Sequence, residues 1–291
     1  MTRPEITQAM INAYDEYTHL TLDRRGFMAK LTKLAGSGAA AAAIVPLLAA
    51  NPARAAIVAE DDARLKAEDI TYPGSTGEMR GYLAHPAEQS GKLGTVIVIH
   101  ENRGLNPHIR DVARRVALEG FVALAPDFLS PLGGTPEDED KARGMFDQLT
   151  PEQLIADGVA TVGFLEKHEL GNGKVGVVGF CWGGGLANDL AVNAPTLAAA
   201  VAYYGRQPKA EDVAKIKAAL LLHYAGLDER INAGIEAYKA ALQSDGKDFT
   251  IYIYDGAQHA FNNDTSQARY NKEAADLAWG RTIAFFKEKL T

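Results

Sequence analysis

The sequence predicts a protein of the α/β class, with a mainly parallel central sheet flanked by helices on both faces. From Ile57 onward, short β-rich runs alternate with amphipathic segments of helix length, which is typical of parallel strands joined by helices. The later runs are continuous and rich in Val and Ile, as expected of strands that are covered on both faces. No internal repeat or Pro/Ser-rich linker divides this part of the sequence. We therefore predict a single domain over residues 56–291.

Eight apolar runs are the predicted strands. The first two alternate apolar and polar residues and are joined by a Gly-Ser-Thr-Gly-Glu turn, which predicts an antiparallel hairpin at a sheet edge. In chain order the runs cover residues 70–74, 79–86, 94–101, 121–128, 174–180, 198–205, 218–225 and 249–256. The predicted helices between and after them cover residues 109–120, 151–168, 183–194, 231–246 and 271–290. The Pro-, Gly- and acid-rich stretch 130–140 predicts a surface loop in a position to cover a pocket.

Composition excludes some classes of function. The chain has 291 residues, of which 47% are hydrophobic, so it is long enough to bury a large core. Its formal net charge of -7 and the lack of a basic stripe argue against nucleic acid as a partner. The single cysteine can form neither an internal disulfide nor a cysteine-based metal site.

The N-terminal part of the chain differs in composition from the rest. The pair Arg24-Arg25, followed by Phe27 and Lys30, precedes an Ala/Gly-rich apolar stretch. Small residues typical of a cleavage site come next. This order is typical of an export signal. The arginine pair is similar to that of twin-arginine signals, which direct folded proteins to the bacterial periplasm. We therefore predict a periplasmic protein that engages the twin-arginine translocation machinery during export.

The predicted signal covers residues 1–55, with cleavage after Ala55. A membrane anchor is the alternative. The apolar stretch 34–50 is shorter than the roughly 20 residues that span a bilayer and carries no stop-transfer pattern, which favours the export signal and predicts no stable membrane span.

Cys181 lies in the run Gly-Phe-Cys-Trp-Gly, where a buried strand is predicted to end and a helix to begin. This is the G-x-S-x-G nucleophile-elbow pattern with Cys in place of Ser. Gly179 and Gly183 suit such a turn, because a Cβ at either position would collide with neighbouring backbone. The turn brings the sulfur to a helix N-terminus, where the dipole and free amides favour a thiolate. An isolated cysteine is more often a small buried hydrophobe, but this context favours a nucleophile.

Two downstream residues complete a catalytic triad. On folds with this turn the order along the chain is nucleophile, acid, histidine. Asp228 follows one predicted strand and His259 follows the next, so both lie at strand C-terminal ends, where chemistry collects in open α/β sheets. Taken singly, Asp228 is compatible with a helix N-cap and His259 with an ordinary loop residue. His223, inside a strand, is predicted as a hydrogen-bonded core residue, and His108 as a residue on the first turn of a helix.

An oxyanion hole is expected beside the nucleophile. In this pattern it takes the backbone N–H of the next residue, Trp182, and one from the loop after an earlier strand, for which Asn102 is the natural donor. Glu101 in the same loop would place its carboxylate near the thiol and raise the pKa of the thiol. A salt bridge from Glu101 to Arg103, or a cap of the next helix, is the alternative.

The segments His-Glu-Asn-Arg-Gly-Leu-Asn, Gly-Phe-Cys-Trp-Gly-Gly-Gly, Ala-Gly-Leu-Asp-Glu-Arg-Ile and Gly-Ala-Gln-His-Ala-Phe-Asn-Asn-Asp together resemble the dienelactone hydrolase family of the α/β-hydrolase fold. The resemblance spans the chain from about Glu68 to the C-terminus. It implies a triad and an active-site glutamate, carried here by Cys181, Asp228, His259 and Glu101. In the family that glutamate holds the resting thiol neutral until substrate binds.

The resemblance also implies the reaction. It is hydrolysis of an enol-lactone such as 4-carboxymethylenebut-2-en-4-olide through an acyl-enzyme, without a metal or organic cofactor, with the amides of Asn102 and Trp182 holding the oxyanion. Thiolate attack requires a good leaving group, so activated esters and lactones are expected as substrates rather than peptides. A non-catalytic binding protein and a redox-active thiol in an oxidising compartment are the alternatives on this fold.

The sequence departs from the family at two positions that concern the substrate. A well-known member has an arginine four residues after the histidine, which contacts the substrate carboxylate, and Asn263 stands there in this chain. An aromatic residue usually occupies the position of Arg103. Arg206 follows another predicted strand. We predict that Arg103 and Arg206 bind an anionic group from a different side; ordinary surface ion pairs are the alternative.

Overall fold

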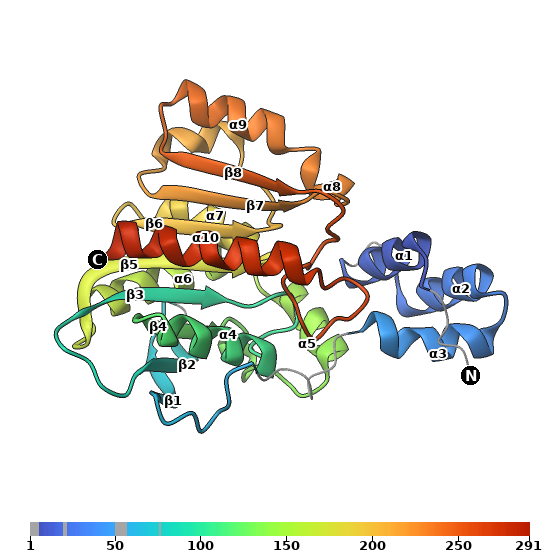
Figure 1. Cartoon of the computed structure of the whole chain (residues 1–291), viewed down its shortest axis with the longest axis horizontal. Coiled ribbons are helices and arrows are strands. Elements are labelled where there is room, and N and C mark those ends of the chain that lie inside the picture. Colours follow the sequence, from blue (N-terminus) through green and yellow to red (C-terminus); the bar gives the residue numbers. More distant parts are fainter. Residues whose placement is uncertain (1–5, 20–21, 50–56, 76) are drawn as a thin grey trace.

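The structure is a computed structural model and describes residues 6–19, 22–49, 57–75 and 77–291. These residues form a large α/β unit and a smaller helical unit that lies at one end of it (Figure 1). The helical unit contains α1 (Gln8–Thr18), α2 (Arg24–Ala35) and α3 (Gly38–Leu48). The α/β unit comprises the described residues from Ile57 onward, and it is the part predicted as the domain.

The described residues contain one eight-stranded sheet, in the order β1-β2-β4-β3-β5-β6-β7-β8. The strands are β1 (Leu65–Pro73), β2 (Glu78–Pro86), β3 (Leu93–Ile99), β4 (Val122–Asp127), β5 (Gly171–Phe180), β6 (Ala199–Tyr203), β7 (Ala219–Ala225) and β8 (Phe249–Tyr254). The pairs β1–β2 and β2–β4 are antiparallel, and all the other neighbours are parallel. The predicted edge hairpin and the mainly parallel sheet are confirmed.

Helices cover both faces of the sheet, as Figure 1 shows. One apolar cluster lies under α6 (Pro151–Glu166), α7 (Trp182–Asn193) and α9 (Ile235–Ser244), and the other lies under α4 (Pro107–Leu118) and α10 (Lys272–Leu290). In β5, Val175 and Val177 belong to the first cluster, whereas Val178 and Phe180 belong to the second. Since successive side chains of a strand point to opposite faces, a strand buried on both sides requires an uninterrupted apolar run.

Two local features differ from the sequence-based prediction. The predicted helix 231–246 is divided into α8 (Glu229–Asn232) and α9, and a Cβ at Gly234 between them would lie 2.4 Å from the side-chain oxygen of Gln207. The stretch 130–140 contains a short 3-10 helix, η2 (Ser130–Leu132), and the start of α5 (Glu139–Met145). Thr135 in this stretch is held by Asp127 through its amide at 2.7 Å and its hydroxyl at 2.8 Å. Two further 3-10 helices are η3 (Phe146–Gln148) and η4 (Ala210–Lys215).

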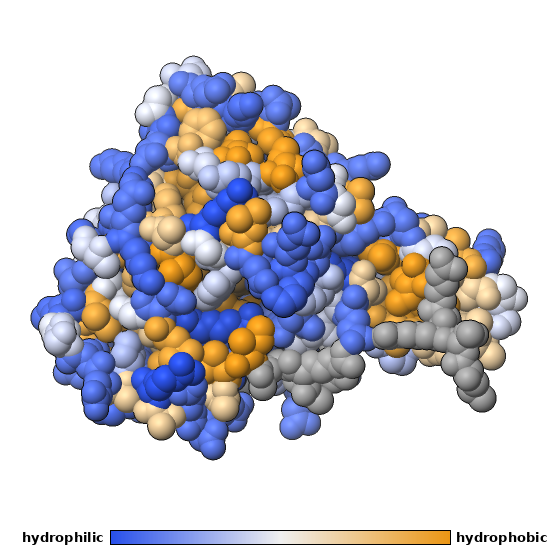
Figure 2. Space-filling view, in the orientation of Figure 1, coloured by the Kyte–Doolittle hydropathy of each residue, from blue (hydrophilic) through white to orange (hydrophobic). Residues whose placement is uncertain are grey.

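The helical unit has a small apolar core of its own. Side chains from all three helices meet in it, among them Tyr17, Phe27, Leu31 and Ile44. The rings of Tyr17 and Phe27 stack with centroids 4.8 Å apart. Figure 2 shows apolar side chains beside polar ones on the visible face of this unit. The unit is therefore held by packing among its own helices as well as by its contacts with the α/β unit.

The helical unit falls within the predicted export signal. The arginine pair lies at the exposed start of α2, whereas the predicted cleavage position after Ala55 lies outside the described residues. Within the described residues, none of the helices alone combines the length and hydropathy needed to cross a membrane; α2 and α3 reach both only as a pair, with a bend of 110° between them. Export by the twin-arginine route stays a prediction.

Candidate active site

Cys181 occupies a strained turn between β5 and α7. Its backbone has φ 56° and ψ -113°, a combination that L-residues rarely adopt. A Cβ at Gly179 would lie 1.9 Å from the carbonyl oxygen of Gly183, and a Cβ at Gly183 would lie 2.4 Å from that of His100. The Cys181 amide donates to the carbonyl of Tyr203 on the neighbouring strand at 3.0 Å. The two glycines are thus required by close backbone approaches, and the surrounding strands hold the turn.

Asp228 and His259 form a buried pair at the carboxyl ends of β7 and β8. Nδ1 of His259 lies 2.5 Å from Oδ2 of Asp228, and the two residues are 3% and 6% exposed. The other carboxylate oxygen of Asp228 accepts from the amide of Ile231 at 3.2 Å and caps α8. The carboxylate therefore serves both as the helix cap and as the partner of His259, because it uses a different oxygen for each.

The charges around His259 favour its protonated form. Burial lowers the pKa of His259, but the charges of Cys181 and Asp228 and the hydrogen bond to Asp228 outweigh burial and raise it to about 10. Burial raises the pKa of Asp228, and the interactions with His259 overcome this and lower it. At neutral pH His259 is therefore an imidazolium. A cysteine reacts as its thiolate, so a positive charge beside Cys181 suits nucleophilic attack.

The loop after β3 is fixed by a buried histidine. Nε2 of His100 accepts from the amide of Phe128 at 3.2 Å, so Nδ1 carries the proton and donates to the carbonyl of Glu101 at 2.6 Å. The imidazole also stacks on the indole of Trp182, with centroids 5.4 Å apart and planes at 8°. His100 thereby ties the loop that contains Glu101 and Asn102 to the residue that follows the nucleophile.

Glu101 has a partner that the sequence did not suggest. Its Oε2 accepts from the side-chain amide of Asn263 at 2.9 Å, and both residues are buried. Arg103 forms its ion pair with Glu139, and α4 is capped by Asn106. The two alternative roles predicted for Glu101, a salt bridge to Arg103 and a cap of the next helix, are therefore wrong. Asn263, which stands where a well-known member of the resembled family has an arginine, supplies a neutral donor to this carboxylate.

Tyr204 lies among the charged groups of the site. Burial, followed by the charges of Glu101 and Cys181, raises the pKa of the Tyr204 phenol well above its ordinary value. Its ring centroid lies 5.0 Å from that of His259. Tyr204 directly follows β6, and nothing in its sequence context pointed to a role in the site. Its place there follows from the order of β6 and β7 in the sheet.

A pocket of about 380 Å³ opens at Cys181. Of the predicted site residues, Cys181, Asn102, Trp182, Arg206 and His259 line it. Further lining residues include aromatic, aliphatic, cationic and acidic side chains, among them Phe146, Leu154, Tyr204, Arg143, Arg230, Asp147 and Asp189. Several of them come from residues 143–154, directly after the stretch predicted to cover a pocket. The roles of the Asn102 and Trp182 amides in holding an oxyanion stay predictions.

The two predicted substrate-binding arginines lie in different surroundings. Arg206 lines the pocket and forms an ion pair with Asp189, which also lines it. Arg103 is 8% exposed; it pairs with Glu139 and donates to the hydroxyl of Tyr14 in α1 at 2.7 Å. The structure does not bring Arg103 to the pocket wall, and its outer side is covered by the helical unit.

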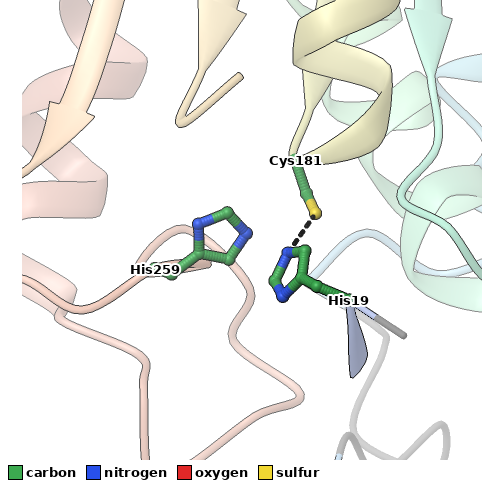
Figure 3. Close-up of side chains that lie close together, drawn as sticks. All are labelled: His19, Cys181 and His259. Carbon is green, nitrogen blue, oxygen red and sulfur yellow. Dashed lines mark hydrogen bonds between the residues drawn. The ribbon is translucent and has the colours of Figure 1, made fainter. Parts of the chain in front are cut away.

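His19, at the C-terminal end of α1, also belongs to the site, although no sequence pattern pointed to it. Its Nε2 is 3.5 Å from Sγ of Cys181 (Figure 3). The same nitrogen is 2.9 Å from a guanidinium nitrogen of Arg230. Its ring meets that of His259 edge to face, with centroids 4.8 Å apart. His19 and Cys181 are 162 positions apart, and no motif connects them. His19 also lies in the segment predicted as a signal.

Hydrogen bonds fix the tautomer of His19. A guanidinium can only donate, so Nε2 accepts from Arg230 and Nδ1 carries the proton, which it donates to the carbonyl of Asp15 at 2.6 Å. Burial, with the charges of His259 and Arg230, lowers the pKa of His19 to about 2. His19 is therefore neutral and its Nε2 lone pair faces the sulfur of Cys181.

The C-terminal end of α1 is held over the site by two polar contacts. The side-chain amide of Asn102 donates to the carbonyl of Thr18 at 2.6 Å. Arg143 donates to the carbonyl of Tyr17 at 3.0 Å, and its guanidinium lies 4.1 Å from the centre of the Tyr17 ring. Both donors line the pocket, so α1 uses groups that would otherwise face a substrate.

Comparison with known proteins agrees with this geometry. The model of the dienelactone hydrolase family matches residues 79–290. The chain belongs to the dienelactone hydrolase family. The prediction that it is an enzyme, a hydrolase of the carboxylic-ester and lactone type, is confirmed at the level of the family. Family membership supports this prediction over the non-catalytic and redox alternatives.

Individual relatives cover most of the chain. A protein of Saccharolobus solfataricus named "Putative carboxymethylenebutenolidase" is 34% identical over 76% of this chain and 98% of its own length. One of Escherichia coli K12 with the same name is 32% identical over 82% of this chain and 93% of its own. The crystal structure titled "Putative Dienelactone Hydrolase" from Klebsiella pneumoniae has a TM-score of 0.69 at 30% identity, covering 77% and 98% of the two chains. The predicted α/β-hydrolase fold is confirmed.

Proposed function

We propose that this dienelactone hydrolase family member cleaves lactones or activated carboxylic esters through an acyl-enzyme on Cys181, with dienelactones among the candidate substrates. The observation that carries the proposal is the position of Cys181 on a strained turn at the pocket, beside the hydrogen-bonded His259–Asp228 pair. Nucleophile, base and orienting acid are the three parts that covalent acyl transfer requires.

The first step forms the thioester. The Cys181 thiolate attacks the carbonyl carbon, and the amides of Trp182 and Asn102 hold the developing oxyanion. Trp182 is the first residue of α7, where backbone amides have no partner within the helix. When the carbon–oxygen bond breaks, the enolate or alkoxide leaves and takes the proton of the His259 imidazolium.

The second step releases the acid. His259, now neutral, takes a proton from a water molecule that attacks the thioester carbonyl. The carbon–sulfur bond breaks and the thiolate returns, paired again with the imidazolium. Asp228 keeps the proton on Nδ1 of His259 throughout, because its Oδ2 accepts from that nitrogen.

The pocket favours small substrates that carry an anionic group. Its volume of about 380 Å³ suits a small acyl group, and three arginines, Arg143, Arg206 and Arg230, outnumber the two aspartates that line it, one of which is paired with Arg206. We assign the carboxylate of the substrate to Arg206. Arg103 would join it only after α1 has moved away, because Tyr14 and Glu139 occupy its guanidinium in the full chain.

We also propose that residues 1–55 direct the protein to the periplasm by the twin-arginine route. The exposure of Arg24 and Arg25 at the start of α2 supports this, since the arginine pair is accessible while the unit remains folded, although Arg24 also forms an exposed ion pair with Asp140. Replacing both arginines by lysine should keep the chain in the cytoplasm, as measured by cell fractionation, and periplasmic accumulation of this variant would contradict the proposal.

The hydrolase proposal is tested with the full chain and Cys181→Ala, each incubated with p-nitrophenyl acetate and a dienelactone. Turnover and the mass of the intact protein are followed together. Turnover with a transient acyl adduct, both absent in the variant, is expected. Turnover by Cys181→Ala at the rate of the parent would overturn the thiol mechanism while leaving the family assignment intact.

A further inference from the structure

Three metal-ligand atoms converge at the mouth of the pocket. They belong to His19, Cys181 and His259, and all lie within 4.8 Å of one another (Figure 3). We propose that these three side chains bind a Zn²⁺ ion, or a Co²⁺ ion in its place, as a regulatory site that joins the helical unit to the catalytic nucleophile. Metal binding itself does not depend on the proposed hydrolysis; only its inhibitory consequence does.

Both histidines can offer Nε2 to a metal, His19 once Arg230 has turned away and His259 once its imidazolium has lost a proton. Nδ1 of His259 is bonded to Asp228, and its Nε2 is buried without a hydrogen-bond partner among the described residues. Nδ1 of His19 is bonded to the carbonyl of Asp15, which leaves Nε2 as the acceptor nitrogen. Histidines that ligate zinc have this arrangement, in which the second nitrogen donates to a carboxylate or backbone carbonyl and orients the ring.

The sulfur–nitrogen distance fits a tetrahedral ion. Sγ of Cys181 and Nε2 of His19 are 3.5 Å apart. Zinc–sulfur and zinc–nitrogen bonds of about 2.3 and 2.0–2.1 Å at tetrahedral angles separate the two ligand atoms by about 3.5 Å. Two imidazoles and one thiolate form a borderline-soft set that suits Zn²⁺ rather than Mg²⁺ or Ca²⁺. The fourth position would be taken by water in the pocket.

Arg230 competes for the same lone pair. Its guanidinium nitrogen lies 2.9 Å from Nε2 of His19, so the metal can bind only when this side chain moves away. Arg230 is exposed and can turn into solvent. Removing the guanidinium should therefore tighten metal binding, a gain that a misfolded variant cannot produce.

Metal binding would stop acyl transfer. The ion binds the thiolate electron pair that otherwise attacks the carbonyl. It also replaces the proton shared by Cys181 and His259, and that proton is released to solvent. No atom changes oxidation state. Because His19 belongs to α1, the bound ion would also fasten the helical unit over the pocket. The full chain would thus be held in a closed, reversible state.

The test uses the full chain after removal of metals with a chelator. Co²⁺ is added without substrate, and the thiolate-to-cobalt absorption band in the near ultraviolet is followed; Zn²⁺ then displaces it. One equivalent should bind, Cys181→Ala should abolish the band, and His19→Ala should weaken binding at least about tenfold. Arg230→Gln should tighten binding. His168→Ala, which removes a histidine outside the cluster, is the matched control and should bind as the parent does.

The outcomes separate the two proposals. Absence of the cobalt band in the parent chain, or unchanged affinity in His19→Ala with a normal circular dichroism spectrum, would overturn the metal site. Neither result would affect the hydrolase proposal, which is read from turnover and acyl adducts of the metal-free chain. If the site exists, stoichiometric Zn²⁺ should inhibit the parent at least about tenfold more strongly than His19→Ala.

Discussion

The α/β unit and the helical unit are stabilised in different ways and contribute different things to the site. The α/β unit buries a sheet between two layers of helices, and its strand ends carry Cys181, Asp228 and His259. The helical unit has a small core and meets the pocket mainly through polar contacts, adding His19. The residues of the proposed triad therefore all lie in the α/β unit, and the helical unit affects the accessibility of the pocket.

The contacts between the units predict that the α/β unit does not depend on the helical one. Arg103 and Arg269 are buried where the units meet, and their partners in α1 are Tyr14 and Asp15. Without α1 these guanidinium groups would return to water, where they need no protein partner. Loss of the helical unit should therefore expose cationic groups without opening the core of the sheet.

The largest effect is expected at the triad acid. Asp228→Asn should lower kcat/KM by about 10⁴-fold, because an amide cannot hold the proton on Nδ1 of His259 in the required tautomer. Asp245→Asn, at an exposed aspartate beyond α9, should be indistinguishable from the parent. A similar loss in both variants would remove the distinction between a catalytic carboxylate and a surface one.

The second effect concerns the charge of His259. Its pKa of about 10 should be measurable by NMR titration and should fall in Cys181→Ala, because the charge of Cys181 is the largest of the causes that raise it. The folded value lies above the ordinary 6.5, so this proton stabilises the folded chain below pH 6.5. That stabilisation should be lost as the pH rises from 6.5 to about 10. A His259 pKa near 6.5 in both proteins would contradict the ion pair.

The third prediction separates the stabilities of the two units. Leu31→Ala removes a fully buried side chain from the helical core and should destabilise that unit by about 2–5 kcal/mol. Hydrogen exchange should rise in α1, α2 and α3 and stay unchanged in the central strands. Leu34→Ala, on the same helix but 39% exposed, is the control and should have little effect. Loss of protection in the sheet would show that the units do not unfold separately.

The fourth prediction is smaller and lies within the site. Asn263→Ala leaves the buried Glu101 carboxylate without its amide donor and removes the acceptor of the Thr265 amide and hydroxyl, which should cost at least about 1–3 kcal/mol of unfolding free energy in a denaturant titration. Asn193→Ala removes an exposed asparagine and should change stability by less than about 0.5 kcal/mol. Equal stability of the two variants would mean that the Glu101–Asn263 contact is not needed in the folded chain.

The sequence predicted the α/β unit well because its signals are local. The continuous runs, the glycines on either side of Cys181 and the order of Asp228 and His259 each follow from backbone geometry that a short segment can specify. The break between α8 and α9 was missed; Gly234 lies at this break, where Gln207 from a different part of the chain leaves no room for a Cβ.

The missed features of the site are contacts between distant segments. The Asn263–Glu101 hydrogen bond and the approach of His19 to Cys181 each join residues 162 positions apart. Composition assigned the first 55 residues to export, and composition cannot show how such a segment packs. Contacts between distant segments also engage Arg103, which is bound by Tyr14 and Glu139. Its substrate-binding role was predicted from its place after a strand.

The most direct test of this division of roles compares the full chain with residues 56–291 alone. Circular dichroism and thermal unfolding establish that the shorter chain is folded, and kcat/KM is measured for p-nitrophenyl acetate and an anionic lactone, both without metal. The account predicts that residues 56–291 retain the thiol-dependent activity and gain in kcat/KM, most for the anionic lactone, because Asn102, Arg103 and Arg143 become free. A folded but inactive shorter chain would contradict it, since His19 and α1 would then be part of the catalytic machinery.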